Sequence, residues 1–188
     1  FRAQRKKKDG TKPSIQTVNN DHVVLKHCLN VAIRRGLLQI NPATRVPLPD
    51  PQNARDRVLT EEEWSKLYEA AKGHLKPVLL LAYQLGQRFG EIVGLTWDRV
   101  DLKRGVITLR SQDTKTKKPR QVPMTPDIRV ALQRLAKVRS LSTRHVFTFR
   151  GKPIQRISRS FRTTLKDAGI TDFRFHDLRH CASTNLRR

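Results

Sequence analysis

Prolines crowd one short part of this sequence, and they limit how the chain can fold. Four of them stand among charged residues: Pro42, Pro47, Pro49 and Pro51. Proline fixes its own backbone angle and lacks an amide hydrogen, so a segment this rich in proline is stiff and excludes helix. We therefore expect a linker at 47–57, between a helical unit at 1–46 and a larger unit at 58–188.

The first unit contains one clear helical pattern. Between Thr17 and Arg35 apolar side chains recur at helical spacing, and Gly36 stands where such a helix would end. A short apolar segment then returns toward Asn41 and Pro42. A single helical hairpin is too small to be a whole domain, so we interpret 1–46 as part of one.

The larger unit combines helices with a few short strands. Thr60 and Glu63 form a capping box, and the segment from Leu75 to Leu85 is apolar enough to predict a buried helix. Further expected elements are a helix from Arg88 through Trp97, a hairpin of 105–109 and 121–124 whose second strand is short or at the edge, a helix from Thr125-Pro126, a strand at 146–149, a helix at 155–168 and a last helix carrying His176. The predicted fold class is α+β, mainly α-helical, with a small antiparallel sheet.

Charge narrows the range of partners. The 188 residues include 39 Lys and Arg against 16 Asp and Glu, giving a formal charge of +23. Such an excess favours a polyanionic partner, and nucleic acid is the commonest one. No apolar run approaches the ~18 residues of a membrane-spanning helix. Cys28 and Cys181 form no C-x-x-C pair, which predicts neither a disulfide framework nor a zinc site and is typical of a reducing cytoplasm.

The segment FHDLRH, residues 175–180, is the strongest candidate for phosphate chemistry. On a helix, His176 and Arg179 would share a face and offer a phosphate an imidazole and a planar guanidinium fork. His176 and His180 also have the spacing of a zinc helix. However, Asp177 replaces the general-base Glu and no third ligand is evident, so we expect no metal.

Two further groups of charges accompany that segment. Arg88 and Glu91 are three residues apart, an arrangement that an ordinary surface ion pair would also explain. Lys115, Lys117 and Lys118 crowd the expected hairpin loop at 111–119. A basic loop of this kind either stays in solvent, where its charges keep other strands from pairing with the sheet edge, or reaches into a groove of a nucleic acid.

Taken in order, these segments resemble the tyrosine recombinases, the phage integrase family. The matching text is LGQRFGEIVGLTWDRVDL, TKTKKPRQVPM and FHDLRH, within Val58 to Arg188. Residues 17–46, with NVAIRRGLLQINPA, resemble the last helices of the family's core-binding domain. The resemblance implies cleavage of double-stranded DNA through a 3′-phosphotyrosine, by a tetramer on DNA, without metal or cofactor.

The resemblance also implies roles for single residues. Arg88 and Arg179 would hold the non-bridging phosphate oxygens, Lys115 would protonate the leaving 5′-oxygen, His176 would donate a hydrogen bond and shuttle a proton, and Glu91 would brace the site. Lys117 competes with Lys115 for the role of the catalytic lysine. Other expected DNA contacts are Lys117, Lys118, Arg120, Arg34 and Arg35.

The sequence departs from the family pattern in places. The nucleophilic tyrosine and a second histidine or tryptophan should follow Arg179, whereas Tyr68 and Tyr83 precede Arg88 and fit buried helical stripes. We therefore expect a fragment that cannot itself cleave DNA. Gln87 and Phe89 replace more usual aliphatic or small residues. The alternatives are a DNA-binding or regulatory relative without catalysis, and a relative with topoisomerase or hairpin-resolving activity.

Overall fold

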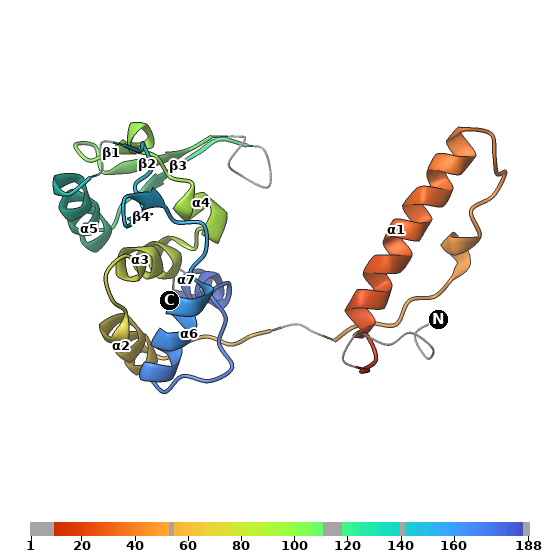
Figure 1. The fold of residues 1–188 in the computed structure, drawn as a ribbon, viewed down its shortest axis with the longest axis horizontal. Coiled ribbons are helices and arrows are strands. Elements are labelled where there is room, and N and C mark those ends of the chain that lie inside the picture. Colours follow the sequence, from red (N-terminus) through yellow and green to blue (C-terminus); the bar gives the residue numbers. More distant parts are fainter. Residues whose placement is uncertain (1–9, 53–54, 111–117, 140–141, 186–188) are drawn as a thin grey trace. The chain divides into compact units, whose positions relative to one another are not determined.

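A computed structural model of the protein defines residues 10–52, 55–110, 118–139 and 142–185 (Figure 1). The chain divides into two compact units, residues 1–54 and 55–188. The division falls inside the segment predicted to be a linker.

The first unit is built on the long helix α1, Ile15–Arg34, followed by the short 3-10 helix η1, Pro42–Arg45. The predicted helix is confirmed, and it ends before Gly36, whose φ of 72° suits glycine. Asn41 ties the two helices together because its side-chain amide donates to the Lys26 carbonyl at 3.0 Å and its side-chain oxygen accepts from the Ala43 N–H at 3.0 Å. No side chain of α1 is buried within the described chain.

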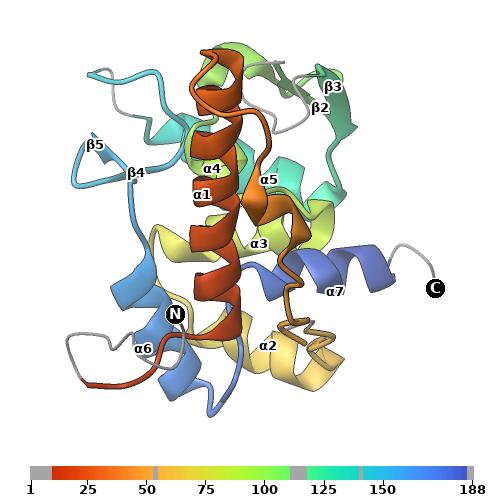
Figure 2. The same ribbon diagram turned by 90° about the vertical axis from the view of Figure 1, so that its right-hand side faces the viewer.

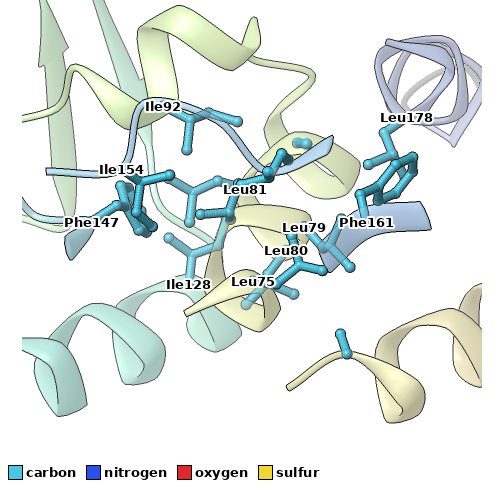
Figure 3. Packing of buried hydrophobic residues seen from close by; sticks show 14 of the residues in the cluster. Leu75, Leu79, Leu80, Leu81, Ile92, Ile128, Phe147, Ile154, Phe161 and Leu178 are labelled. Carbon is cyan, nitrogen blue, oxygen red and sulfur yellow. The ribbon is translucent and has the colours of Figure 1, made fainter. Parts of the chain in front are cut away.

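The second unit is organised around α3, Leu75–Leu85, which has the bounds that the sequence predicts. Its apolar side chains point in every direction and are covered by α2 (Glu61–Ala70), α5 (Pro126–Lys137) and α7 (Asp177–Asn185). Figure 3 shows Leu79 and Leu81 of this helix packed among Ile92, Ile128 and Leu178. The capping box of Thr60 and Glu63 at the start of α2 is confirmed.

The helix that begins after Arg88 is much shorter than predicted. It is α4, Phe89–Val93, and the expectation of a helix through Trp97 is wrong. The chain leaves the helix because Leu95 pairs with a distant segment: its carbonyl accepts the Val146 N–H at 2.9 Å. Trp97 begins the 3-10 helix η2, Trp97–Arg99, with its N–H donating to the Arg144 carbonyl.

A three-stranded antiparallel sheet of order β1-β2-β3 follows. Its strands are β1 (Val100–Asp101), β2 (Val106–Leu109) and β3 (Arg120–Pro123). The predicted hairpin and the edge position of its second strand are confirmed, whereas β1 was not predicted. The tip of the hairpin, residues 111–117, lies outside the described residues.

The remaining elements close the unit. Thr125 caps α5 as predicted, β4 (Thr148–Phe149) pairs with β5 (Lys152–Pro153), and α6 (Ser158–Asp167) precedes α7. The strand predicted at 146–149 and the helix predicted at 155–168 are both shorter in the structure. The fold is α+β and mainly helical, as predicted. Within the described ranges no helix is long and apolar enough to cross a membrane.

Candidate active site

The corner between α3 and α4 places Arg88. Gly86 caps α3 with φ 59° and ψ 26°, a left-handed conformation that glycine adopts without the clash of a β-carbon. The chain then extends through Gln87, and Arg88 is the residue immediately before α4. The sequence text LGQR therefore encodes a tight corner that presents an arginine at the start of a helix.

Glu91 is the buried anchor of this corner. Its side chain is only 2% exposed, and its carboxylate accepts hydrogen bonds from the Arg88 backbone N–H at 3.0 Å and from the Arg88 guanidinium at 3.0 Å. A second guanidinium, from Arg120, donates to the carboxylate at 2.9 Å. The predicted pairing of Arg88 with Glu91 is confirmed, and Glu91 holds two arginines rather than one.

Arg120 arrives from the edge strand β3, where it faces Leu109 of β2. Because side chains alternate along a strand, Arg120 shares a face with Val122, which lies opposite the buried Ile107. Its guanidinium therefore reaches Glu91 from the inner side of the sheet. The sequence predicted only a DNA contact for Arg120. Its spacing from Val122 was the signal that it also faces inward.

Arg179 joins the cluster from α7, which packs along α3 (Figure 2). Its guanidinium donates to the Gly86 carbonyl at 2.6 Å. The helices approach closely here, since a β-carbon on Gly86 would lie 3.1 Å from that of Ala182. The glycine that turns the chain toward Arg88 thus also supplies the acceptor that orients Arg179.

The cluster carries an excess of positive charge. Partial burial lowers the pKa of Arg179, repulsion from Arg88 and Arg120 adds to that effect, and attraction to Glu91 opposes it. An arginine nevertheless stays protonated at neutral pH. Three guanidinium groups against one carboxylate form a site suited to an anion, and each guanidinium has five N–H donors, so most remain for a ligand.

His176 lies in a different position from that predicted. It precedes α7 instead of lying on it, because the buried carboxylate of Asp177 accepts the Arg174 N–H at 2.9 Å and closes a tight turn. The Arg179 N–H donates to the His176 carbonyl at 3.1 Å, so the two residues stay close in the chain. The exposed His176 ring lies 6.1 Å from the ring of His180, centroid to centroid. Across the part of the chain that the structure describes, no group of three or more His, Cys, Asp or Glu could hold a metal ion.

Other predicted residues lie elsewhere. Lys115 and Lys117 fall outside the described residues, and Lys118 is exposed at the near end of the same loop. The DNA contacts expected of Arg34 and Arg35 stay predictions; both residues are exposed at the end of α1 in the other unit.

Neither tyrosine belongs to the cluster. Tyr68 and Tyr83 are partly buried against Trp64, with ring centroids at 5.3 and 3.7 Å from the tryptophan. Burial raises the pKa of Tyr68, which disfavours its ionised form.

Comparisons with known proteins identify the family of the chain. The profile of the phage integrase family matches residues 57–188. The integrase of Salmonella phage P22 is 28% identical over 183 residues, and the shufflon-specific DNA recombinase of Escherichia coli is 32% identical over 168. These alignments cover 90% and 87% of the chain but 46% and 42% of the relatives, so the chain spans less than half of their length.

Solved structures show the same fold. The Tn1549 transposon integrase in complex with circular intermediate DNA matches with a TM-score of 0.73 at 22% identity, over 93% of this chain and 67% of that one. A lambda integrase from a tetramer bound to a Holliday junction matches with a TM-score of 0.72 at 22% identity, over 89% and 53%. The fold is therefore that of a tyrosine recombinase catalytic domain. The chain belongs to the phage integrase family.

Proposed function

We propose that this chain is the catalytic part of a site-specific tyrosine recombinase, which cuts and rejoins double-stranded DNA through a 3′-phosphotyrosyl intermediate. The observation that carries the proposal is the convergence of Arg88, Arg120 and Arg179 around Glu91 and the Gly86 carbonyl. Binding DNA needs only exposed cations. Guanidinium groups that come from three distant parts of the chain and are held in place at one point are suited to binding one phosphate, rather than a DNA surface as a whole.

The proposed chemistry uses these groups without a metal. Attack on a phosphodiester creates a phosphorane whose negative charge grows in the transition state, and preorganised donors stabilise it most. Arg88 and Arg179 hold the non-bridging oxygens, while Lys115 protonates the leaving 5′-oxygen. His176 supplies a further donor or a proton. Glu91 acts as a brace, because its oxygens are already occupied by arginine donors.

We assign the attack to a tyrosine outside these 188 residues, in the full-length protein or in a partner protomer. Tyr68 and Tyr83 are unsuited to it, since both pack against Trp64. We further propose that residues 1–46 are the end of a core-binding domain, that the full-length protein acts as a tetramer on DNA in the cytoplasm, and that Arg34, Arg35, Lys117 and Lys118 contact the DNA backbone.

The test uses a duplex selected from a random-sequence pool by binding to this chain, then nicked so that a cleaved strand is trapped. Full-length protein should form a covalent adduct visible on a denaturing gel. Arg179→Ala should abolish that adduct and keep most of the binding, whereas the exposed control Arg134→Ala on α5 should form it normally. Binding without any wild-type adduct would instead identify a non-catalytic DNA-binding relative. An adduct that survives Arg179→Ala would refute the role of Arg179.

A further inference from the structure

The end of the predicted linker is fastened to the segment that carries His176. Arg55, the first residue of the second unit, donates from its guanidinium to the side chain of Asp172 at 3.0 Å and to the backbone carbonyl of Asp172 at 2.8 Å. The same guanidinium donates to the carboxylate of Asp177 at 3.2 Å. Residues 172–177 form a short loop that leads into α7, and we call it the α7 loop. One arginine therefore holds both ends of this loop.

Two further contacts attach the residues after Arg55 to the same region. The guanidinium of Arg57 lies over the ring of Phe173, 5.9 Å from its centroid. The backbone N–H of Leu59 donates to the sulfur of Cys181 at 3.3 Å. Phe173, Leu59 and Cys181 are all buried. The chain that leads from the linker into α2 thus contacts the α7 loop and the first half of α7 at successive points, so the bonds of Arg55 are not an isolated surface contact.

The α7 loop determines where His176 lies. Phe175, the residue before it, packs edge to face against Phe89 and Phe161, with ring centroids at 5.4 and 5.7 Å. His176 lines a hollow of about 530 Å³ together with Phe89, which begins α4 beside the arginine cluster. Among the described residues the ring of His176 forms no hydrogen bond, and its recorded contact is with the ring of His180. The backbone of the loop, rather than a partner of the ring, therefore sets the position of His176.

The buried carboxylate of Asp177 makes its contact with Arg55 more than a surface ion pair. The Asp177 side chain is 4% exposed, and its carboxylate also accepts the Arg174 N–H that closes the turn. Exposed ion pairs contribute little to stability, whereas a buried carboxylate without a counter-ion is costly to desolvate. Within the described ranges Arg55 is the only cation paired with Asp177. Loss of Arg55 would remove the charge that allows Asp177 to be buried, and the turn would open.

We propose that Arg55 is a positioning residue for His176, because it holds the α7 loop at both ends and so sets where the imidazole lies beside the arginine cluster. The inference rests on the proposed function. It extends that function from the groups that would touch the phosphate to a linker residue that would not. The alternative is that Arg55 only stabilises the fold, in which case its replacement would act through global unfolding alone.

The first experiment measures opening of the α7 loop in this chain, without DNA. The Arg174 N–H donates to the Asp177 carboxylate, so hydrogen exchange of the Arg174 amide, followed by NMR, reports closure of the turn. The amide of Leu81, in the middle of the buried helix α3, reports global unfolding. Arg55→Gln should speed exchange at Arg174 about tenfold, because bonds to charged groups are lost, and should speed exchange at Leu81 much less.

Two other variants serve as controls for this measurement. Arg129 also holds a loop through a backbone carbonyl, that of Lys103 at 2.9 Å, so Arg129→Gln removes the same charge elsewhere and should leave exchange at Arg174 unchanged. Asp172 is 80% exposed with φ 49°, a left-handed conformation that asparagine tolerates. Asp172→Asn should therefore fold normally, and it should speed exchange at Arg174 in the same direction as Arg55→Gln but less.

The second experiment links the loop to the reaction. Formation of the covalent adduct by the full-length protein is followed in a single turnover at saturating duplex, for Arg55→Gln, His176→Ala and the double variant. If Arg55 acts through His176, Arg55→Gln should slow the reaction in the wild-type background but not further in the His176→Ala background. The DNA affinity of Arg55→Gln should equal that of Arg129→Gln, since each lacks one positive charge.

The outcomes separate this inference from the proposed function. Absence of any adduct from the wild-type full-length protein would overturn the proposed function and the catalytic use of the loop together. A normal wild-type adduct that Arg55→Gln forms at the same rate would overturn only the inference. Independent effects of the Arg55 and His176 substitutions would overturn it as well. Equal acceleration of exchange at Arg174 and Leu81 would show that Arg55 only stabilises the fold.

Discussion

Gly86→Ala adds only one methyl group, and we predict that it destabilises the chain more than any other substitution of that size. Gly86→Ala forces a left-handed conformation on an L-residue, which costs about 1–2 kcal/mol. The new β-carbon would also lie 3.1 Å from that of Ala182. Favourable carbon contacts lie at about 3.5–4.0 Å, and overpacking of this kind costs about 1–3 kcal/mol more. We expect a total loss of about 2–5 kcal/mol in the free energy of unfolding.

Two other glycines allow the backbone cost and the overpacking cost of Gly86→Ala to be measured separately. Gly169 has φ +68°, and a β-carbon added there would meet no atom within 4 Å, so Gly169→Ala reports the backbone cost alone. Gly90 lies in α4 with open space around it, so Gly90→Ala should stabilise the chain by about 0.5–1 kcal/mol. Urea unfolding of the wild type and the three variants gives the free energy of unfolding of each. The difference between Gly86→Ala and Gly169→Ala is the cost of the close approach of α7 to α3.

The close approach matters for function because the Gly86 carbonyl orients Arg179. If α7 shifts by a few tenths of an ångström, the covalent adduct of the full-length protein should decrease more than its DNA binding. A Gly86→Ala variant no less stable than Gly169→Ala would refute the tight packing of α7 on this corner. A variant that is destabilised but forms adduct at the normal rate would refute its link to Arg179.

Three further changes test other parts of the unit. Gln87 is 2% exposed, and neither the oxygen nor the nitrogen of its side-chain amide has a hydrogen-bond partner among the described residues. Gln87→Leu should therefore raise the free energy of unfolding by about 1 kcal/mol. A lower free energy of unfolding in urea would instead reveal a hydrogen bond from this amide to water or another group. Asp177→Asn should lower the free energy of unfolding by about 2 kcal/mol, because a buried charged acceptor is lost. An unchanged urea midpoint would contradict this prediction. The hydrogen bond from Arg57 holds the pKa of Glu63 below its ordinary value. The ion pair of Arg57 and Glu63 therefore stabilises the fold at a pH above the carboxyl pKa of the unfolded chain, and this stabilisation is lost as the pH falls through the carboxyl pKa of the folded chain. Glu63→Gln keeps the cap and should cost about 0.5 kcal/mol at pH 7, and this cost should disappear as the pH falls through the folded pKa of Glu63. A cost that stays the same in acid would contradict the ion pair.

The sequence predicts the structure best where the determining chemistry is local. The cap at Thr60, the Thr125-Pro126 start of α5 and the glycine after α1 each act within one helical turn, and all were predicted correctly. The family resemblance supplied Arg88 and Arg179 as site residues, and the structure brings both to the same cluster.

The failures share a different cause, which is contact between distant segments. The helix after Arg88 stops early because Leu95 pairs with Val146, which no local pattern reveals. The short strand β1 exists only because its two residues pair with β2. Arg120 reaches Glu91 across 29 positions of sequence, and although its spacing from Val122 indicates an inward-facing side chain, no local pattern reveals Glu91 as its partner.

A single buried carboxylate among three arginines decides how this site is held before any phosphate binds. Guanidinium groups gathered without a counter-ion repel one another, and a carboxylate buried alone is costly to desolvate. Glu91 relieves both effects, since it accepts from Arg88 and Arg120 and so fixes the direction of each. Arg179 is fixed by a neutral acceptor, the Gly86 carbonyl, which adds no negative charge. The arginines are thus oriented by two anchors that neutralise only one of their three charges, and the remaining positive charge is left for the phosphate.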